Sequence, residues 1–152
     1  MIGIVIAAHG RLAEELALTA RQIVGELPAV ATCSVQPGAS PEEIRAAIDA
    51  AIQTVDTGDG VMVLADLYGG SPCTQSLMLC ARQNLEVLTG VNLPMVLKAN
   101  SLRMTEKSLP VLARTLAQHA QANITLASLL LRHPAAYRPG PRRQPADSRA
   151  GD

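Results

Sequence analysis

Aromatic residues are almost absent from this sequence, which has no phenylalanine, no tryptophan and two tyrosines. Hydrophobic residues nevertheless make up 48% of its 152 residues, so a core has to be built from alanine, valine, leucine, isoleucine and methionine. Such side chains suit the closely packed layers of an α/β protein. The length fits a single domain with a sizeable core.

Long apolar runs and an excess of either charge are also missing. No run approaches the roughly 18 apolar residues that a membrane helix needs. The formal net charge is zero, so nothing in the sequence predicts that nucleic acid or an anionic membrane is bound through charge. The N-terminus shows no export signal, which favours a cytoplasmic protein.

Cysteine is scarce, with Cys33, Cys73 and Cys80 as its three occurrences. They are odd in number and do not have the spacing of metal ligands. We therefore expect reduced, small buried thiols in a cytoplasmic protein, and no metal site.

Short apolar runs alternate with amphipathic stretches along the chain, and this alternation predicts strands and helices in turn. Strands are predicted at 2–8, 30–35, 61–65, 85–91 and 123–131. Helices are predicted from 12 to about 25, at 41–55, from 71 to about 83, from 92–94 onwards and at 108–122. The clearest local signal is Ser40-Pro41-Glu42-Glu43, which has the pattern of a capping box with proline at the first helical position.

The alternation predicts an α/β fold, a single-domain open parallel sheet flanked by helices and joined by right-handed crossovers. A strand order of 2-1-3-4 would make the first and third strands neighbours. The domain is expected to span residues 1–131. Residues 132–152 are rich in proline and arginine without apolar periodicity, so this tail is predicted to be disordered.

His9 and Asp66 each stand where an apolar strand runs towards glycine. The carboxyl ends of parallel strands are where ligands gather. An aspartate that accepts a hydrogen bond from one ring N–H fixes the imidazole tautomer and leaves the other nitrogen as a nucleophile. Taken singly, the histidine could be satisfied at a strand end and the aspartate could cap a turn. The pair favours a functional site.

The segment Gly69-Gly70-Ser71-Pro72 follows Asp66 and opens a predicted helix. Glycine lets backbone N–H groups approach a ligand, and a helix N-terminus favours an anion. A phosphoryl group beside His9 would then be held by these amides and the Ser71 hydroxyl. By itself the segment also fits an ordinary turn with a serine cap, and it lacks the lysine of a Walker loop.

Other polar residues carry weaker signals. Arg11 follows His9 and could contact phosphate or a partner, although a solvated arginine is the favoured interpretation. Cys73 lies in the first turn of a predicted helix, where a thiol pKa can fall, but a small buried residue is favoured. His119 and His133 receive no catalytic role.

Three segments in the same order carry a resemblance to a known family. They are Ile-Gly-Ile-Val-Ile-Ala-Ala-His-Gly at 2–10, Val-Leu-Ala-Asp-Leu-Tyr-Gly-Gly-Ser-Pro at 63–72, and Thr-Gly-Val-Asn-Leu-Pro-Met at 89–95. With them the chain resembles, over about 1–131, the mannose-family IIA domain of the bacterial phosphoenolpyruvate:sugar phosphotransferase system (PTS EIIA).

The resemblance implies a phosphoryl carrier. His9 would accept a phosphoryl group from phospho-HPr and pass it to a IIB component, Asp66 would orient His9, and residues 69–72 would line the phosphate site. No metal or organic cofactor is implied. The family also implies a homodimer that exchanges a fifth strand, for which 123–131 is the candidate, and a membrane contact only through a permease.

Three other functions remain open. Because no IIB domain follows, the chain could be a regulatory phosphoprotein of an incomplete phosphotransferase system that signals metabolic state. It could also be the related phosphodonor domain of dihydroxyacetone kinase, although the Gly-Gly-Ser-Pro segment favours the mannose type. The remotest alternative is a hydrolase that depends on Cys73.

Overall fold

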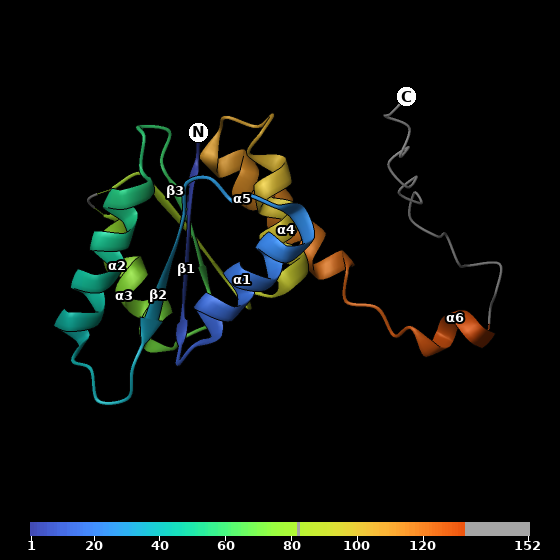
Figure 1. Cartoon of the computed structure of the whole chain (residues 1–152), viewed down its shortest axis with the longest axis horizontal. Coiled ribbons are helices and arrows are strands. Elements are labelled where there is room, and N and C mark those ends of the chain that lie inside the picture. Colours follow the sequence, from blue (N-terminus) through green and yellow to red (C-terminus); the bar gives the residue numbers. More distant parts are fainter. Residues whose placement is uncertain (82, 133–152) are drawn as a thin grey trace, which may run out of the picture.

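The computed structural model describes residues 1–81 and 83–132. Its centre is a sheet of four parallel strands in the order β2-β1-β3-β4 (Figure 1). The strands are β1 (Gly3–His9), β2 (Val30–Val35), β3 (Val61–Ala65) and β4 (Leu85–Thr89). This is the predicted α/β architecture, with the predicted strand order.

Helices cover both faces of the sheet. They are α1 (Leu12–Val24), α2 (Pro41–Val55), α3 (Ser71–Cys80), α4 (Leu93–Leu102), α5 (Leu109–Ala122) and the short α6 (Ser128–Arg132). Figure 1 shows α2 and α3 on one face and α1, α4 and α5 on the other, while α6 lies away from the sheet. Two apolar cores result, one on each face.

The position of β1 between two helix layers explains why its sequence is apolar up to Ala8. Ile4, Ile6 and Ala8 belong to the core under α1, α4 and α5. Val5 and Ala7 point to the opposite core under α2. Successive side chains of a strand alternate between its faces, so a strand covered on both sides has no polar position. His9 is the first exposed residue of this strand.

Local capping signals were mostly predicted correctly. Ser40 and Glu43 form the capping box, with the Ser40 N–H donating to Glu43 Oε2 at 2.8 Å and the Glu43 N–H donating to Ser40 Oγ at 3.2 Å. The serine cap expected at Ser71 is wrong, because Gly70 is the N-cap and Ser71 is the first helical residue. The Ser71 hydroxyl is therefore not used as a cap.

The predicted strand at 123–131 does not form in this single chain. Residues Ser128–Arg132 form α6 instead, and Ile124, Leu126 and Leu129 are exposed. A strand needs a neighbour for its backbone N–H and C=O groups, whereas a helix pairs them internally. Within residues 1–81 and 83–132, nothing pairs with this segment as a strand. The tail at 133–152 lies outside the described residues.

A buried arginine was not predicted from the sequence. Arg103 follows α4 and is fully buried. Its guanidinium donates to the carbonyl oxygens of Ile2 (3.2 Å), Ala29 (3.0 Å) and Pro28, and to Asn100 Oδ1. It thereby ties the end of α4 to the chain entering β1 and β2.

Candidate active site

The sheet brings His9 and Asp66 together at one edge. Parallel pairing of β1 and β3 aligns Ala7 with Ala65, so the residues that follow the two strands are neighbours. His9 Nδ1 lies 2.9 Å from Asp66 Oδ2, and the His9 backbone N–H donates to the same oxygen at 2.9 Å. The predicted pair is therefore in hydrogen-bond contact, although the two residues are 57 positions apart.

The hydrogen bonds around Asp66 keep its carboxyl group ionised. Partial burial on its own would raise the pKa of Asp66. The backbone and ring N–H groups of His9 and the Leu67 N–H, which donates to Oδ1 at 2.8 Å, outweigh this effect and lower the pKa below its ordinary value. An ionised carboxylate only accepts hydrogen bonds, so Nδ1 of His9 must carry the proton.

This arrangement gives the two ring nitrogens different roles. With the proton on Nδ1, a neutral imidazole has its free lone pair on Nε2. The His9 side chain is 47% exposed, whereas that of Asp66 is 14% exposed. The His9 ring is therefore accessible, whereas the carboxylate bonded to it is shielded.

A cavity of about 310 Å³ opens beside His9. Gly10 and Ser71 line it together with the loop 36–39, which connects β2 to α2. Of the four residues predicted to bind phosphate, Ser71 lines this cavity, while Gly69 and Pro72 do not. Gly70 instead lies close to the His9 ring.

The backbone of the Gly69-Gly70-Ser71-Pro72 segment limits which amides can face an anion. The Gly70 N–H donates to the Leu67 carbonyl at 3.1 Å, and proline has no N–H. The first-turn amides of a helix have no partner within that helix. The N–H groups that the α3 N-terminus offers are therefore those of Ser71 and Cys73.

Comparison with known proteins identifies the family. Residues 3–116, well over half of the chain, match the family model "EIIA-man: PTS system fructose IIA component". The chain belongs to the mannose family of PTS IIA components. These are components of the bacterial sugar phosphotransferase system.

Several relatives support this assignment. The chain is 35% identical over 108 residues to the mannose-specific EIIAB component of Escherichia coli (strain K12), which covers 70% of this chain and 33% of that protein. The chain thus spans about a third of that relative's length. It is 27% identical over 104 residues to the fructose-specific EIIA component of Bacillus subtilis (strain 168), covering 68% and 71%.

Solved structures give the same result. The mannose/sorbose-specific IIA subunit from Enterococcus faecalis superposes with a TM-score of 0.74 at 30% identity, covering 82% of this chain and 92% of the other. EIIA from Streptococcus agalactiae gives a TM-score of 0.77 at 25% identity, covering 85% and 99%.

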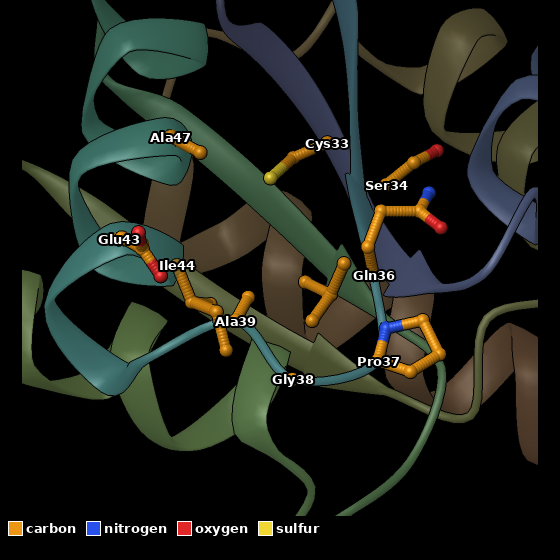
Figure 2. A pocket seen from close by; sticks show the side chains of 10 residues that line it. Cys33, Ser34, Gln36, Pro37, Gly38, Ala39, Glu43, Ile44 and Ala47 are labelled. Atoms are coloured by element: carbon orange, nitrogen blue, oxygen red, sulfur yellow. The ribbon is translucent and has the colours of Figure 1, made fainter.

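A second cavity of about 500 Å³ shares the loop 36–39 with the cavity beside His9 in this IIA component. Figure 2 shows the Cys33 sulfur pointing towards α2, and Ile44 of α2 beside Ala39 of the loop. Burial raises the pKa of the Cys33 thiol, so this thiol stays protonated. Glu43 also lines the cavity, but its carboxylate is held by the capping box. No residue type in this segment indicates that the loop 36–39 forms a wall of both cavities.

The weaker candidates do not join the site. Arg11 is turned onto α1, where it pairs with Glu15 at 2.9 Å and Glu14 at 3.6 Å. Cys73 is buried to 1% exposure, so a substrate has no access to its thiol. His119 lies on α5.

Metal-binding clusters and membrane-spanning helices are both missing from the described part of the chain. Among these residues, no three His, Cys, Asp or Glu side chains are grouped so that they could hold a metal ion. None of the helices described there has the length and apolar character needed to cross a membrane.

Proposed function

We propose that this IIA component carries a phosphoryl group on His9, accepting it from phospho-HPr and passing it to a IIB component. Family membership supports the proposal. The observation that carries it is the 2.9 Å contact between His9 Nδ1 and the ionised carboxylate of Asp66, because this contact leaves Nε2 as an accessible nucleophile. No metal or organic cofactor takes part.

In the first transfer, the Nε2 lone pair attacks the phosphorus in line with the bond to the donor. That bond breaks, and its electron pair stays on the donor atom of HPr. Positive charge develops on the His9 ring and is stabilised by Asp66, which keeps Nδ1–H hydrogen-bonded. The Ser71 hydroxyl and the free amides of the α3 N-terminus donate to the equatorial oxygens. Transfer to IIB is the same displacement with His9 as the leaving group.

The shape of the site suits a relay. The carrier must release the phosphoryl group as readily as it binds it, and a deeply enclosed pocket would trap the group. His9 is half-exposed at the end of its strand, so both the donor HPr and the acceptor IIB component can reach it. Phosphoryl transfer of this kind needs positioning and charge stabilisation rather than deep burial.

A homodimer in the cytoplasm completes the proposal. The 123–131 segment exposes Ile124, Leu126 and Leu129. Exposed apolar side chains favour association, and among the described residues the outer strands of the sheet, β2 and β4, each have one unpaired side. The segment would pair as an exchanged strand once a second chain supplies the missing backbone partners. Light scattering on the purified chain measures its molar mass in solution and so tests the proposed dimer. We expect the mass of two chains, and a monomer at micromolar concentration would contradict the proposal.

Reconstituted phosphoryl transfer tests the proposed function. Wild type, His9→Ala and His119→Ala are incubated with phosphoenolpyruvate, enzyme I and HPr from the same source. His119 is the matched control, since it is a histidine on α5 outside the site. We expect an acid-labile phosphoryl group on wild type and on His119→Ala, and none on His9→Ala with its fold retained. Labelling of His9→Ala would refute the proposal.

The acceptor decides between transport and regulation. Labelled wild type is mixed with IIB components of the mannose family. Loss of the label to IIB supports the relay. A stable label in the presence of every IIB tested would favour the regulatory phosphoprotein, whose phosphorylated state controls a binding partner.

A further inference from the structure

Gly70 lies against the imidazole ring of His9. A Cβ atom built on Gly70 would be 3.0 Å from His9 Cε1 and 3.2 Å from the Leu67 carbonyl oxygen. Such a contact is too close for ordinary packing. Gly69 and Gly10 flank the site as well, but a Cβ on either would meet no atom within 4 Å. The ring contact is therefore specific to Gly70 among the glycines at this edge.

The backbone conformation of Gly70 does not itself require glycine. Its φ of −69° and ψ of 164° lie in the extended region that any residue adopts. Its N–H donates to the Leu67 carbonyl at 3.1 Å, and its carbonyl accepts the Thr74 N–H at 2.9 Å in the first turn of α3. Position 70 is thus fixed from both sides, and a side chain there would crowd the neighbouring ring most closely and the Leu67 carbonyl next.

Two contacts then define the plane of the imidazole. Asp66 holds Nδ1 through a hydrogen bond, and Cε1 borders the space that a side chain at position 70 would enter. Cε1 is bonded to both ring nitrogens, so a contact there restricts the swing of Nε2. A hydrogen bond at one atom leaves the ring free to pivot about that atom, whereas a second contact removes this freedom.

We propose that Gly70 is a positioning residue: because it has no side chain, the His9 ring can lie close to it, and this neighbour at Cε1 sets the direction of Nε2. The consequence for phosphoryl transfer rests on the proposed function. This role differs from that of an amide donor to phosphate, because the Gly70 N–H is already bonded to Leu67.

Gly70→Ala tests the role without straining the backbone. Because residue 70 is held by Leu67 and Thr74, the half-exposed ring is the part that must move. A displacement of about 1 Å can cost roughly 100-fold in rate, so a shift of some tenths of an ångström is expected to slow single-turnover phosphorylation about tenfold. The half-saturating concentration of phospho-HPr should stay unchanged, since the added methyl group faces the ring and not the partner.

Nuclear magnetic resonance reads the ring without any donor protein. Long-range proton–nitrogen spectra of His9 report the tautomer and the hydrogen bond at Nδ1. In Gly70→Ala we expect both ring nitrogen signals to move. In wild type we expect a nuclear Overhauser effect between His9 Hε1 and the Gly70 Hα protons, and this measurement holds whether or not the variant folds well.

Gly25→Ala is the matched control. Gly25 has φ of 84° at the end of α1, where an added Cβ meets nothing within 4 Å. Alanine there strains the backbone and lowers stability, while the His9 signals and the transfer rate should stay as in wild type.

Two results would overturn the positioning role: no Overhauser effect between His9 and Gly70 in wild type, or ring signals and a rate in folded Gly70→Ala that equal those of wild type. Failure of wild type to accept a phosphoryl group would refute the relay instead, and the spectra would still decide the ring contact.

Discussion

The carboxylate of Asp66 separates the two nitrogens of His9 into different roles. One oxygen accepts both the ring N–H and the backbone N–H of His9, and the other accepts the Leu67 N–H. In the proposed transfer, the same group would fix the tautomer beforehand and face the positive charge that develops on the ring. Neither effect would need a change of structure.

Asp66→Asn is predicted to slow phosphoryl transfer to His9 by roughly 10²–10⁴-fold, the scale seen when a histidine loses the carboxylate that fixes its tautomer. An amide is nearly the same shape, but it carries no charge and can present an N–H to the ring. The fold should be retained, as measured by circular dichroism. Single-turnover kinetics give the rate, and a loss of less than threefold would contradict the orienting role.

The lowered pKa of Asp66 also predicts how the stability of wild type, compared with that of Asp66→Asn, depends on pH. A carboxyl group with a depressed folded-state pKa stabilises the fold above its unfolded pKa of about 3.9 and loses that contribution as the pH falls through the folded value. The difference in unfolding free energy between wild type and Asp66→Asn should therefore be largest at neutral pH and shrink below about pH 4. Urea titrations at pH 7 and pH 3 measure it, and a difference that grows in acid would contradict the assignment.

At the scale of helices and strands, the sequence predicts best where its signals are local. The strands at 30–35 and 61–65 have the predicted bounds, because turn residues border each apolar run. The predicted strand at 85–91 ends early, at Thr89. Gly90 has φ of 79° and turns the chain, so the Val91 N–H bonds to the Ala65 carbonyl of β3.

Errors arise where a segment depends on a partner. The apolar and β-branched residues of 123–131 favour a strand, but a strand requires a sheet edge that accepts it. In the described part of one chain the end of this segment folds into α6. Its apolar pattern carries no information on whether a second chain supplies that edge.

Within the candidate site, too, features with a local sequence signal were predicted, whereas features that depend on three-dimensional placement were not. His9, Asp66 and Ser71 were predicted because polar residues after apolar strands, and a turn that opens a helix, are visible in the sequence. The contact of Gly70 with the His9 ring was not, since it depends on side-chain placement across two loops. The cavity wall at 36–39 likewise contains no residue type that marks it as functional.

At the scale of the whole molecule, Arg103 joins parts of the chain that are far apart in sequence. It lies 101 residues from Ile2 and 74 from Ala29 in the sequence. Its fully buried guanidinium donates hydrogen bonds to the backbone carbonyls of both residues. Burial lowers the pKa of Arg103, but guanidinium remains protonated in proteins. Its hydrogen-bond partners include no carboxylate, so its charge is compensated by three backbone carbonyls and the side-chain oxygen of Asn100.

Arg103→Met is predicted to destabilise the fold by about 2–4 kcal/mol, because buried carbonyls lose their donor and each unsatisfied group costs roughly 1–3 kcal/mol. Urea denaturation measures the change. The control Arg114→Met, at an exposed position of α5, should stay within about 0.5 kcal/mol of wild type. Equal stability of the two variants would show that Arg103 does not tie the domain together.

The central claim is that Nε2 of His9 carries the phosphoryl group while Nδ1 stays bonded to Asp66. The most direct measurement is phosphorus–nitrogen coupling in the protein labelled with ¹⁵N and phosphorylated through HPr. We predict a one-bond coupling from phosphorus to His9 Nε2, with the proton retained on Nδ1. Phosphorus bonded to Nδ1, or to any other residue, would contradict this account.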